Sequence, residues 1–490
     1  MVKHLRQHKR PPTKAVPVSA QGDGHKKNTP VGNLIFKRAV VFFEQGKFSE
    51  ASALYKQVLE KNPKDASAWL NLGTALRRMD RSEAAIACCR RALELSPGNS
   101  SYLTNYGNAL ADLEQEQESL DAHAAAARAK PDDFLICRNY AIALRDFRHF
   151  DEALVYFDKA LRLRPDDVSL QWDRAITYLH LGRFKEGWEA FEVRWKVPPM
   201  QERVMSVPRW RGENISGKTV LVYEEQGFGD TILCSRYIPM IAARGGRVIL
   251  ECKKPLHRLF QSVQGIDKIV EVGMIDEVFD YHIPMMSLPG IFKTGLSSIP
   301  SPANLCVPDS VQPEVTRLLD FAGGRLKVGV VWSGSVTFPH NRRRAVSAAR
   351  FLPLTEIPDI QLYSLQKGPC EKELAECGGQ GLILELGSFL NDFADTAAIL
   401  KQLDLVIMTD SAVAHLAGSL GVPIWNLLNF QPYWLYLSER EDSPWYPSMR
   451  LFRQPEPGDW DSVFARVAQA LEHMIVERDK PQAAKPVKAG

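Results

Sequence analysis

The chain has 490 residues, 45% of them hydrophobic, and its 61 basic and 58 acidic side chains give a formal net charge of +3. This length predicts about two to four domains, and the near balance of charge argues against a nucleic-acid-binding protein. No run of about 18 apolar residues predicts a membrane span, and eight cysteines without a C-x-x-C pair fit a reducing, cytoplasmic location.

The first 31 residues form a basic segment with prolines and glycines and no compensating run of acids. Its basic side chains are Lys3, Arg6, Lys9, Arg10, Lys14, Lys26 and Lys27. Such a composition cannot bury a core, so residues 1–31 are predicted to be a disordered tail.

A repeat of 34 residues follows the tail. Five prolines keep this interval, and each closes a segment with two helical patterns: Pro63, Pro97, Pro131, Pro165 and Pro199. Proline stops a helix because it lacks an N–H and clashes with the preceding turn. The clearest segment places Trp69, Leu72, Gly73, Leu76, Ala85, Ala92 and Pro97 at the spacings of a tetratricopeptide repeat. We therefore expect five such repeats at residues 32–201, stacked as an α-solenoid.

One polar residue recurs within the repeats, as Asn71, Asn105 and Asn139. These positions predict a column on the concave surface, where an asparagine amide can pair with the backbone of an extended peptide. The alternatives are that this asparagine only helps neighbouring repeats to pack, and that the array only supports the next domain.

Short β-rich segments alternate with amphipathic ones after residue 201, which predicts βαβ units and parallel sheets. The segments interpreted as strands are 218–225, 247–252, 266–272, 279–289, 327–335, 360–368, 382–387, 403–411 and 421–428. We expect two Rossmann-like lobes, at residues 202–310 and 311–476, and a disordered tail at 477–490. Ligands of such sheets bind beyond the carboxyl ends of the strands.

The sequence EEQGFGDT follows the first of these strands. Gly227 and Gly229 allow a tight turn and a close approach to a ligand. The segment is neither the dinucleotide fingerprint nor a Walker loop. Asp230 stands where a helix begins, so it is either a cap or a general base that activates an acceptor hydroxyl. Glu225 is the second candidate for the base.

A Gly-Ser loop with a basic cluster opens the second lobe, in WSGSVTFPHNRRRAV. Ser333, Arg343 and Arg344 are candidates for binding a diphosphate, since cations neutralise a departing phosphate. Lys367, at the end of the next strand, is a further candidate. The alternative is a solvated basic loop.

The segment DLVIMTDSAVAHLAGSLGVPIWNLL carries the strongest signal. A strand runs into Asp410 and Ser411, either of which can cap the helix that follows. The N–H groups of that helix would face a diphosphate, and His415 lies one turn further on. The alternatives are that His415 only packs on the sheet and that Asp410 only caps the helix.

The second half of the chain resembles the heptosyltransferase-like glycosyltransferases, and most closely those fused to tetratricopeptide repeats. The resemblance rests on EEQGFGDTILCSRYIP, GVVWSGS, LYSLQKG, DSAVAHLAGSLGVPIW and DSPWYPSMRLFRQ. It implies a GT-B fold with an acceptor lobe and a nucleotide-sugar lobe, and inverting transfer without a cofactor or an obligatory metal. The domain order is similar to that of O-linked N-acetylglucosaminyltransferases. Ala412 departs from the glycine of the classical heptosyltransferases, which puts a heptose donor in doubt.

The sequence therefore predicts a glycosyltransferase in which Asp230 takes the proton of an acceptor hydroxyl. The expected partners are a nucleotide sugar and a protein or glycan acceptor selected by the repeats, with flagellin or another surface protein as a candidate by analogy. The competing hypothesis is a non-catalytic repeat scaffold with a degenerate transferase domain.

Overall fold

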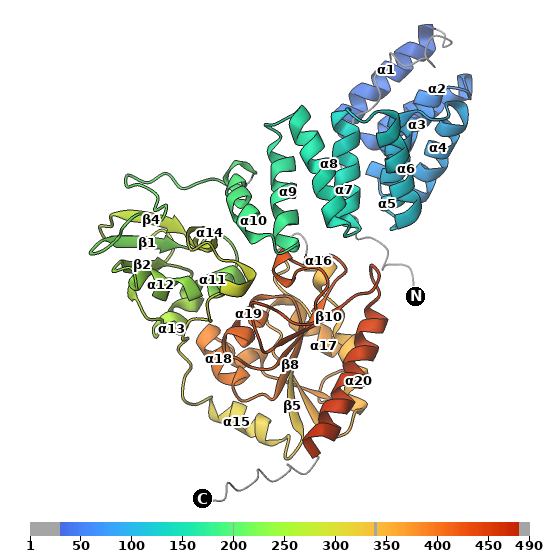
Figure 1. Ribbon diagram of the computed structural model, residues 1–490. Helices are drawn as coiled ribbons and strands as arrows, with labels where there is room; N and C mark the ends of the chain where they lie inside the picture. Colours follow the sequence, from blue (N-terminus) through green and yellow to red (C-terminus); the bar gives the residue numbers. More distant parts are fainter. Residues whose placement is uncertain (1–29, 199, 338–340, 480–490) are drawn as a thin grey trace, which may run out of the picture. The chain divides into compact units, whose positions relative to one another are not determined.

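The computed structural model describes residues 30–198, 200–337 and 341–479 (Figure 1). The chain divides into two compact units. The first unit comprises Met1–Leu181 and Val193–Gln201, and the second comprises Gly182–Glu192 and Glu202–Gly490. Residues 1–29 of the predicted basic tail and Pro199 lie outside the described residues, whereas residues 30 and 31, the end of the predicted tail, already belong to the first helix, Pro30–Glu44.

The described part of the first unit is an array of nine helices in which each helix packs on its neighbours in sequence. They are α1 (Pro30–Glu44), α2 (Phe48–Lys61), α3 (Ala66–Arg78), α4 (Ser82–Leu95), α5 (Ser100–Ala111), α6 (Glu116–Ala129), α7 (Phe134–Asp146), α8 (Phe150–Leu163) and α9 (Val168–His180). The predicted helical solenoid is confirmed.

The first helix of each later repeat begins at an acidic or amide side chain that lies two residues after the repeat proline. These side chains accept hydrogen bonds from the backbone N–H groups of the first turn, and they are Asp65, Asn99, Asp133 and Asp167. An N-cap of this kind typically stabilises a helix by about 1 kcal/mol. The proline that ends one helix pair is thus followed at once by the cap of the next.

The turn inside each repeat also has a fixed backbone geometry. One residue per repeat adopts a positive φ, and these residues are Gly46, Asp80, Glu114, Arg148 and Gly182, again 34 apart. Only the first and the last are glycines, although a left-handed conformation costs other residues about 1–2 kcal/mol. The helix pairing therefore overrides the local preference at the three middle turns.

Helix α1 exposes apolar side chains at positions that are buried in the later repeats. Leu34 is 69% exposed, whereas its equivalents Ile136 and Leu170 are 3% and 0% exposed. Val41 is 48% exposed, whereas its equivalent Ala109 is fully buried. In the later repeats the preceding helix pair covers these positions, and the described residues contain no such pair before α1.

The second helix of the fifth repeat departs from the prediction. This helix, α10 (Phe184–Phe191), belongs to the second unit. Phe184 and Trp188 are buried there against Trp434 and Trp445, with ring centroids 5.3–6.5 Å apart. The predicted boundary at residues 201/202 is therefore shifted, because aromatic packing joins α10 to the α/β unit.

The second unit contains two entirely parallel sheets, as predicted. The four-stranded sheet has the order β3-β2-β1-β4, and its strands are β1 (Thr219–Tyr223), β2 (Arg247–Glu251), β3 (Ile266–Val270) and β4 (Tyr281–Pro284). The six-stranded sheet has the order β10-β9-β8-β5-β6-β7, and its strands are β5 (Leu326–Val331), β6 (Ile360–Ser364), β7 (Ile383–Glu385), β8 (Leu405–Thr409), β9 (Ile424–Leu428) and β10 (Met449–Arg453). The edge strand β10 was not predicted.

Among the described residues, nine short helices lie between the strands of the second unit, and one long helix, α20, follows the last strand. They are α11 (Phe228–Cys234), α12 (Ile238–Ala242), α13 (His257–Phe260), α14 (Leu288–Ile291), α15 (Pro313–Asp320), α16 (Asn341–Arg344), α17 (Glu373–Glu376), α18 (Phe393–Leu400), α19 (Ala412–Ser419) and α20 (Trp460–Asp479). The long helix predicted after β1 is broken between α11 and α12 by a 3₁₀ turn just before Pro239. Helix α20 continues to Asp479, so the tail predicted from residue 477 begins inside it.

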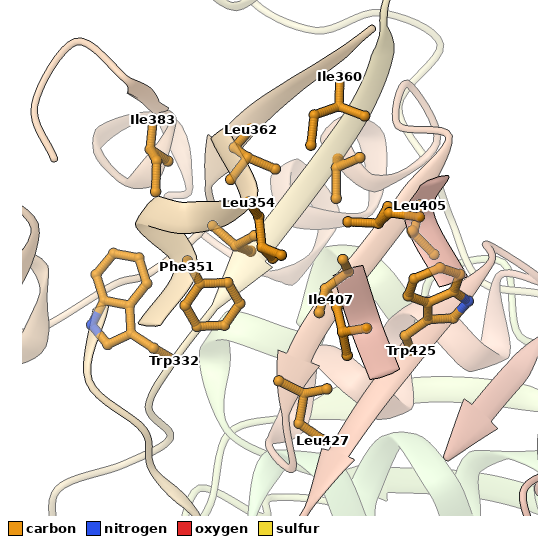
Figure 2. Packing of buried hydrophobic residues seen from close by; sticks show 14 of the residues in the cluster. Trp332, Phe351, Leu354, Ile360, Leu362, Ile383, Leu405, Ile407, Trp425 and Leu427 are labelled. Carbon is orange, nitrogen blue, oxygen red and sulfur yellow. The ribbon is translucent and has the colours of Figure 1, made fainter. Parts of the chain in front are cut away.

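The core of the six-stranded sheet is a continuous cluster of buried apolar side chains (Figure 2). Trp332, directly after β5, packs on Phe351 with ring centroids 6.5 Å apart. Ile407 and Trp425 come from the adjacent strands β8 and β9, and Leu471 joins them from α20. This core fixes the strand ends from which the candidate site is built.

Candidate functional site

Asp230 lies in the first turn of α11, directly after the glycine loop that follows β1. Its Oδ2 accepts the backbone N–H of Gly227 at 3.1 Å, and its Oδ1 accepts the hydroxyl of Tyr433 at 3.4 Å. The carboxylate is thus both a helix cap and a partner of the second lobe. The cap and the contact with the other lobe therefore use different oxygens of the same side chain.

The environment of Asp230 favours its protonated form. Burial raises its pKa to about 6, and the nearby charges of Asp410 and Glu225 act in the same direction. The hydrogen bonds from Gly227 and Tyr433 lower the pKa and only partly offset the burial. A carboxylate with this pKa is mostly ionised at neutral pH and is a stronger base than an exposed aspartate.

Asp410 and Ser411 lie between β8 and α19, as predicted. Asp410 is 8% exposed, accepts the Tyr436 hydroxyl at 2.6 Å and faces the Arg344 guanidinium at 3.5 Å. Ser411 is the N-cap residue of α19, but no side chain accepts a hydrogen bond from the first turn of this helix. The predicted side-chain cap is therefore not formed, because Asp410 turns toward Tyr436 and Arg344.

His415 brings the two lobes together. Helix α19 packs on α11, and a Cβ built at Gly229 would come within 2.6 Å of the His415 ring. Gly229 therefore permits a close contact between the lobes beside Asp230. Burial lowers the pKa of His415 to about 4, so the ring is neutral at pH 7.

An aromatic segment after β9 supplies two tyrosines that the sequence analysis missed. Tyr433 bonds to Asp230 and Tyr436 to Asp410, so one short segment reaches both carboxylates. Leu437, the next residue, has a φ of 55°, a conformation that costs a branched residue about 1–3 kcal/mol. The only signal in the sequence was the density of aromatic residues in PYWLYL.

Tyr446 and Arg236 form a second layer behind His415. The Tyr446 hydroxyl lies 3.0 Å from His415 Nδ1, and the Arg236 guanidinium lies 5.1 Å from the Tyr446 ring centroid. Gly418 makes room for Tyr446, since a Cβ there would meet this ring at 2.5 Å.

The other residues predicted to bind phosphate are Ser333, Arg343, Arg344 and Lys367, and their side chains have different partners within the protein. Ser333 is buried, and its N–H and C=O both bond to the Gln366 side chain. The Lys367 ammonium donates to the Gly387 carbonyl at 3.1 Å. The Arg344 guanidinium faces Asp410, and Arg343 is half-buried.

Glu225 is held by the chain of its own lobe. Its Oε1 accepts the backbone N–H of Met286 at 2.8 Å. It is close enough to Asp230 to raise the pKa of that side chain. This hydrogen bond gives Glu225 a structural role and leaves Asp230 as the better candidate for the base.

The asparagine column in the repeats is more closed than the sequence predicts. Asn71 is 1% and Asn139 is 6% exposed. The Asn105 and Asn139 amides donate to the carbonyls of Ser101 and Leu135, one turn back in their own helices, at 2.9 and 2.7 Å. Helix packing therefore buries Asn71 and Asn139, whereas Asn105 is half-buried.

Residues 30–198, 200–337 and 341–479 contain no group of three or more His, Cys, Asp or Glu side chains placed to hold a metal ion. The same ranges contain no helix that is long and apolar enough to cross a membrane.

A family model described as Tetratricopeptide repeat matches residues 36–100 and 140–193. The first part of the chain is a tetratricopeptide-repeat array. Arrays of this class present extended surfaces for binding other proteins, so this part of the chain is a protein-interaction module.

Protein FlbA of Caulobacter vibrioides is 29% identical over 326 residues, which cover 61% of this chain and 54% of the relative. The chain thus spans about half the length of this relative. The shared region is longer than the first unit, so it reaches into the second.

Similar solved structures cover about a third of the chain. A thermophilic TPR protein of Thermus thermophilus is 17% identical, covers 34% of this chain and 92% of its own, and has a TM-score of 0.31. The pilF protein of Pseudomonas aeruginosa is 19% identical, covers 33% of this chain and 75% of its own, and also has a TM-score of 0.31.

Proposed function

We propose that the second unit is a glycosyltransferase of the GT-B type, which transfers a sugar from a nucleotide-activated donor with inversion. The proposal rests chiefly on Asp230, a carboxylate with a pKa of about 6 that is close enough to Asp410 of the other lobe to be affected by its charge. The residue before it, Gly229, packs against His415 of that lobe. Two lobes that meet at a half-buried acid suit a reaction in which one lobe holds the donor and the other the acceptor.

The proposed reaction is a single displacement. Asp230 takes the proton of an acceptor hydroxyl while the oxygen forms a bond to the anomeric carbon of the sugar. The bond from this carbon to the diphosphate breaks, and its electron pair leaves with the diphosphate. The Tyr433 hydroxyl, 3.4 Å from Asp230 Oδ1, orients the carboxylate.

The leaving diphosphate is proposed to lie at the start of α19. The Ser411 side chain does not cap this helix, so the N–H groups of Ala412 and Val413 are proposed to face an anion, whereas that of Ala414 donates to the Ser411 carbonyl. Arg344 adds positive charge beside Asp410 at 3.5 Å, and His415 adds a hydrogen bond. Stabilisation of developing negative charge commonly contributes most to the rate of group-transfer reactions in enzymes.

The repeats are proposed to select the acceptor, which is a protein or a glycan carried by one. Flagellin or another surface protein remains the candidate by analogy with repeat-fused transferases. The second candidate function is a repeat scaffold without catalysis. It is favoured by the full use of Asp410, which bonds within the protein to Tyr436 and Arg344.

Calorimetry with UDP, GDP, ADP and CMP and their sugar conjugates tests the proposal. We expect one nucleotide to bind, His415→Gln to weaken this binding, and Asp230→Asn to leave it unchanged, because a base acts on the acceptor. Absence of binding by every nucleotide to folded protein would favour the scaffold. Loss of donor affinity in Asp230→Asn would make Asp230 a cap alone.

A further inference from the structure

We infer that Asn341 is a positioning residue that holds the Arg344 guanidinium against the loop of residues 332–335 after β5, so that Arg344 is placed in advance to bind the diphosphate of the donor. The inference rests on the proposed function for the ligand of Arg344. The contact between Asn341 and Arg344 is a property of the protein alone.

The side-chain amide of Asn341 has an orientation that its partners decide. One atom of the amide meets the backbone N–H of Gly334 at 3.1 Å. A backbone N–H can only donate, so this atom is the oxygen Oδ1 and not the nitrogen. The same Oδ1 accepts the Nε–H of Arg344 at 3.3 Å, and Nδ2 donates to Ser333 Oγ at 3.0 Å. One amide, 4% exposed, therefore links the loop after β5 to Arg344.

The loop that carries Gly334 is itself fixed by Gln366. This side chain is 3% exposed and follows β6, the strand paired with β5. Its Oε1 accepts the N–H groups of Trp332 and Ser333 at 3.1 and 2.9 Å, and its Nε2 donates to the Ser333 carbonyl at 3.1 Å. Asn341 is therefore anchored to a segment of backbone whose own polar groups are paired.

Gly334 provides the space in which the guanidinium lies. A Cβ built at Gly334 would come within 2.8 Å of Arg344 Nη2 and within 3.1 Å of Asn341 Oδ1. The guanidinium thus lies directly on the backbone of the loop, an approach that glycine permits. Because Nη2 is the far end of a flexible side chain, a methyl group at position 334 should displace Arg344 without disrupting the fold.

Arg344 extends from this loop toward the start of α19. Strand β8, which ends just before Asp410, is paired with β5 in the sheet, and Arg344 Nη1 lies 3.5 Å from Asp410 Oδ2. This distance is longer than the about 2.7–2.9 Å of a charge-assisted hydrogen bond, so the ion pair is loose. A guanidinium binds phosphate oxygens in a fixed planar geometry. Holding it in advance reduces the loss of side-chain freedom on binding.

Nuclear magnetic resonance of the full chain labelled with ¹⁵N-arginine tests the contact without a ligand. The Nε–H signal of Arg344 is assigned by its loss in Arg344→Lys. We expect this proton to exchange with water more slowly than those of exposed arginines, and to exchange faster in Asn341→Ala, which lacks the acceptor. An unchanged signal in folded Asn341→Ala would overturn the inference. If that variant does not fold, the wild type decides, since exchange as fast as that of an exposed arginine would also overturn it.

Calorimetry with UDP, GDP, ADP and inorganic pyrophosphate tests the role in binding. Asn341→Ala should weaken the binding of the diphosphates that bind by roughly 3- to 30-fold, the effect of one hydrogen bond to a charged group. Arg344→Ala should weaken it further, and the double variant should bind no more weakly than Arg344→Ala, because Asn341 acts through Arg344. Additive losses would mean that Asn341 does not act through Arg344 and would overturn its positioning role.

Two glycine variants give a matched comparison. Gly334→Ala should weaken diphosphate binding, whereas Gly324→Ala should leave it unchanged, because a Cβ at Gly324 would meet nothing within 4 Å. Equal affinities in these two variants would count against the placement of Arg344 on the loop.

The two measurements also separate this inference from the proposed function. If no diphosphate binds and the Arg344 signal depends on Asn341, the positioning by Asn341 is supported and the proposed function fails. If a nucleotide binds and Asn341→Ala leaves its affinity unchanged, the proposed function stands and the inference is overturned.

Discussion

The Tyr433 hydroxyl donates to Asp230 Oδ1 across the two lobes of the second unit, at 3.4 Å. This contact joins an aromatic segment of the six-stranded lobe to the first turn of α11 in the four-stranded lobe. Burial raises the pKa of this carboxylate, which means that its ionised form is less stable than that of an exposed aspartate.

Asp230→Asn is expected to stabilise the second unit at pH 7.5. The pKa of Asp230 is about 6 in the folded protein, against 3.8 for an unperturbed aspartate. The folded state therefore binds the proton more tightly than the unfolded state. The stability that results is fully present below pH 3.8 and is lost as the pH rises through 6. Removing the charge should therefore raise the free energy of unfolding on the order of 1–3 kcal/mol at pH 7.5. Thermal unfolding at pH 7.5 and pH 4.5 measures the effect, which should shrink at the lower pH. Asp309→Asn, at an exposed carboxylate, is the control, and an equal gain in both variants would contradict the shifted pKa.

His123 should make the first unit sensitive to acid. Its side chain is fully buried, neither ring nitrogen has a hydrogen-bond partner, and burial lowers its pKa to about 3. Protonation of His123 is therefore less favourable in the folded state than in the unfolded state. The free energy of unfolding is unaffected by this group above pH 6.5, and it falls by about 1.4 kcal/mol per pH unit as the pH decreases toward 3. His123→Leu should flatten the dependence of the urea midpoint on pH between 7 and 4.5, as followed by circular dichroism.

Shortening an apolar side chain on the exposed face of α1 should cost less stability than the same change at the equivalent, buried position of α9. Leu34→Ala is expected to change the free energy of unfolding by less than about 0.5 kcal/mol, because the side chain is 69% exposed. Leu170→Ala, at the same position of the fifth repeat and fully buried, should cost roughly 2–5 kcal/mol. Urea denaturation of the two variants gives the comparison, and similar losses in both would mean that α1 is covered in solution.

Trp188→Ala should destabilise the second unit, although its position belongs to the repeat period. The indole is 4% exposed, packs on Trp434 with centroids 5.3 Å apart, and donates to the Thr294 carbonyl at 2.9 Å. The expected cost is roughly 3–5 kcal/mol, measured by calorimetry. A chain that starts at Glu202 should aggregate, whereas one that starts at Gly182 should fold. Equal solubility of both truncated chains would contradict the role of α10.

The 34-residue period predicted the helices well because proline acts locally and at each repeat. The caps two residues after the prolines, such as Asp65, could have been predicted in the same way. The burial of the asparagine column could not be predicted, because the sequence shows that a position recurs and does not show which face packing covers: Asn139 repeats in phase and is buried.

The strand ends of the candidate site were also predictable, since Asp230 and Asp410 follow apolar strands. Their partners were not. Tyr433 and Tyr436 lie in an irregular segment whose course depends on tertiary packing and ends at the positive φ of Leu437. Tyr446 reaches His415 from a loop 31 residues away, a distance over which no local pattern applies.

The chain passes between its two units three times by residue 202, because Gly182–Glu192 belongs to the second unit and Val193–Gln201 to the first. No single cut separates them. A recombination event that exchanged the repeats at the end of the fifth period would remove α10 from the α/β unit and expose its aromatic partners. A different repeat array can therefore replace this one only if the exchange occurs upstream of residue 182. We expect the eleven residues Gly182–Glu192 to be inherited together with the α/β unit, whatever repeats precede them.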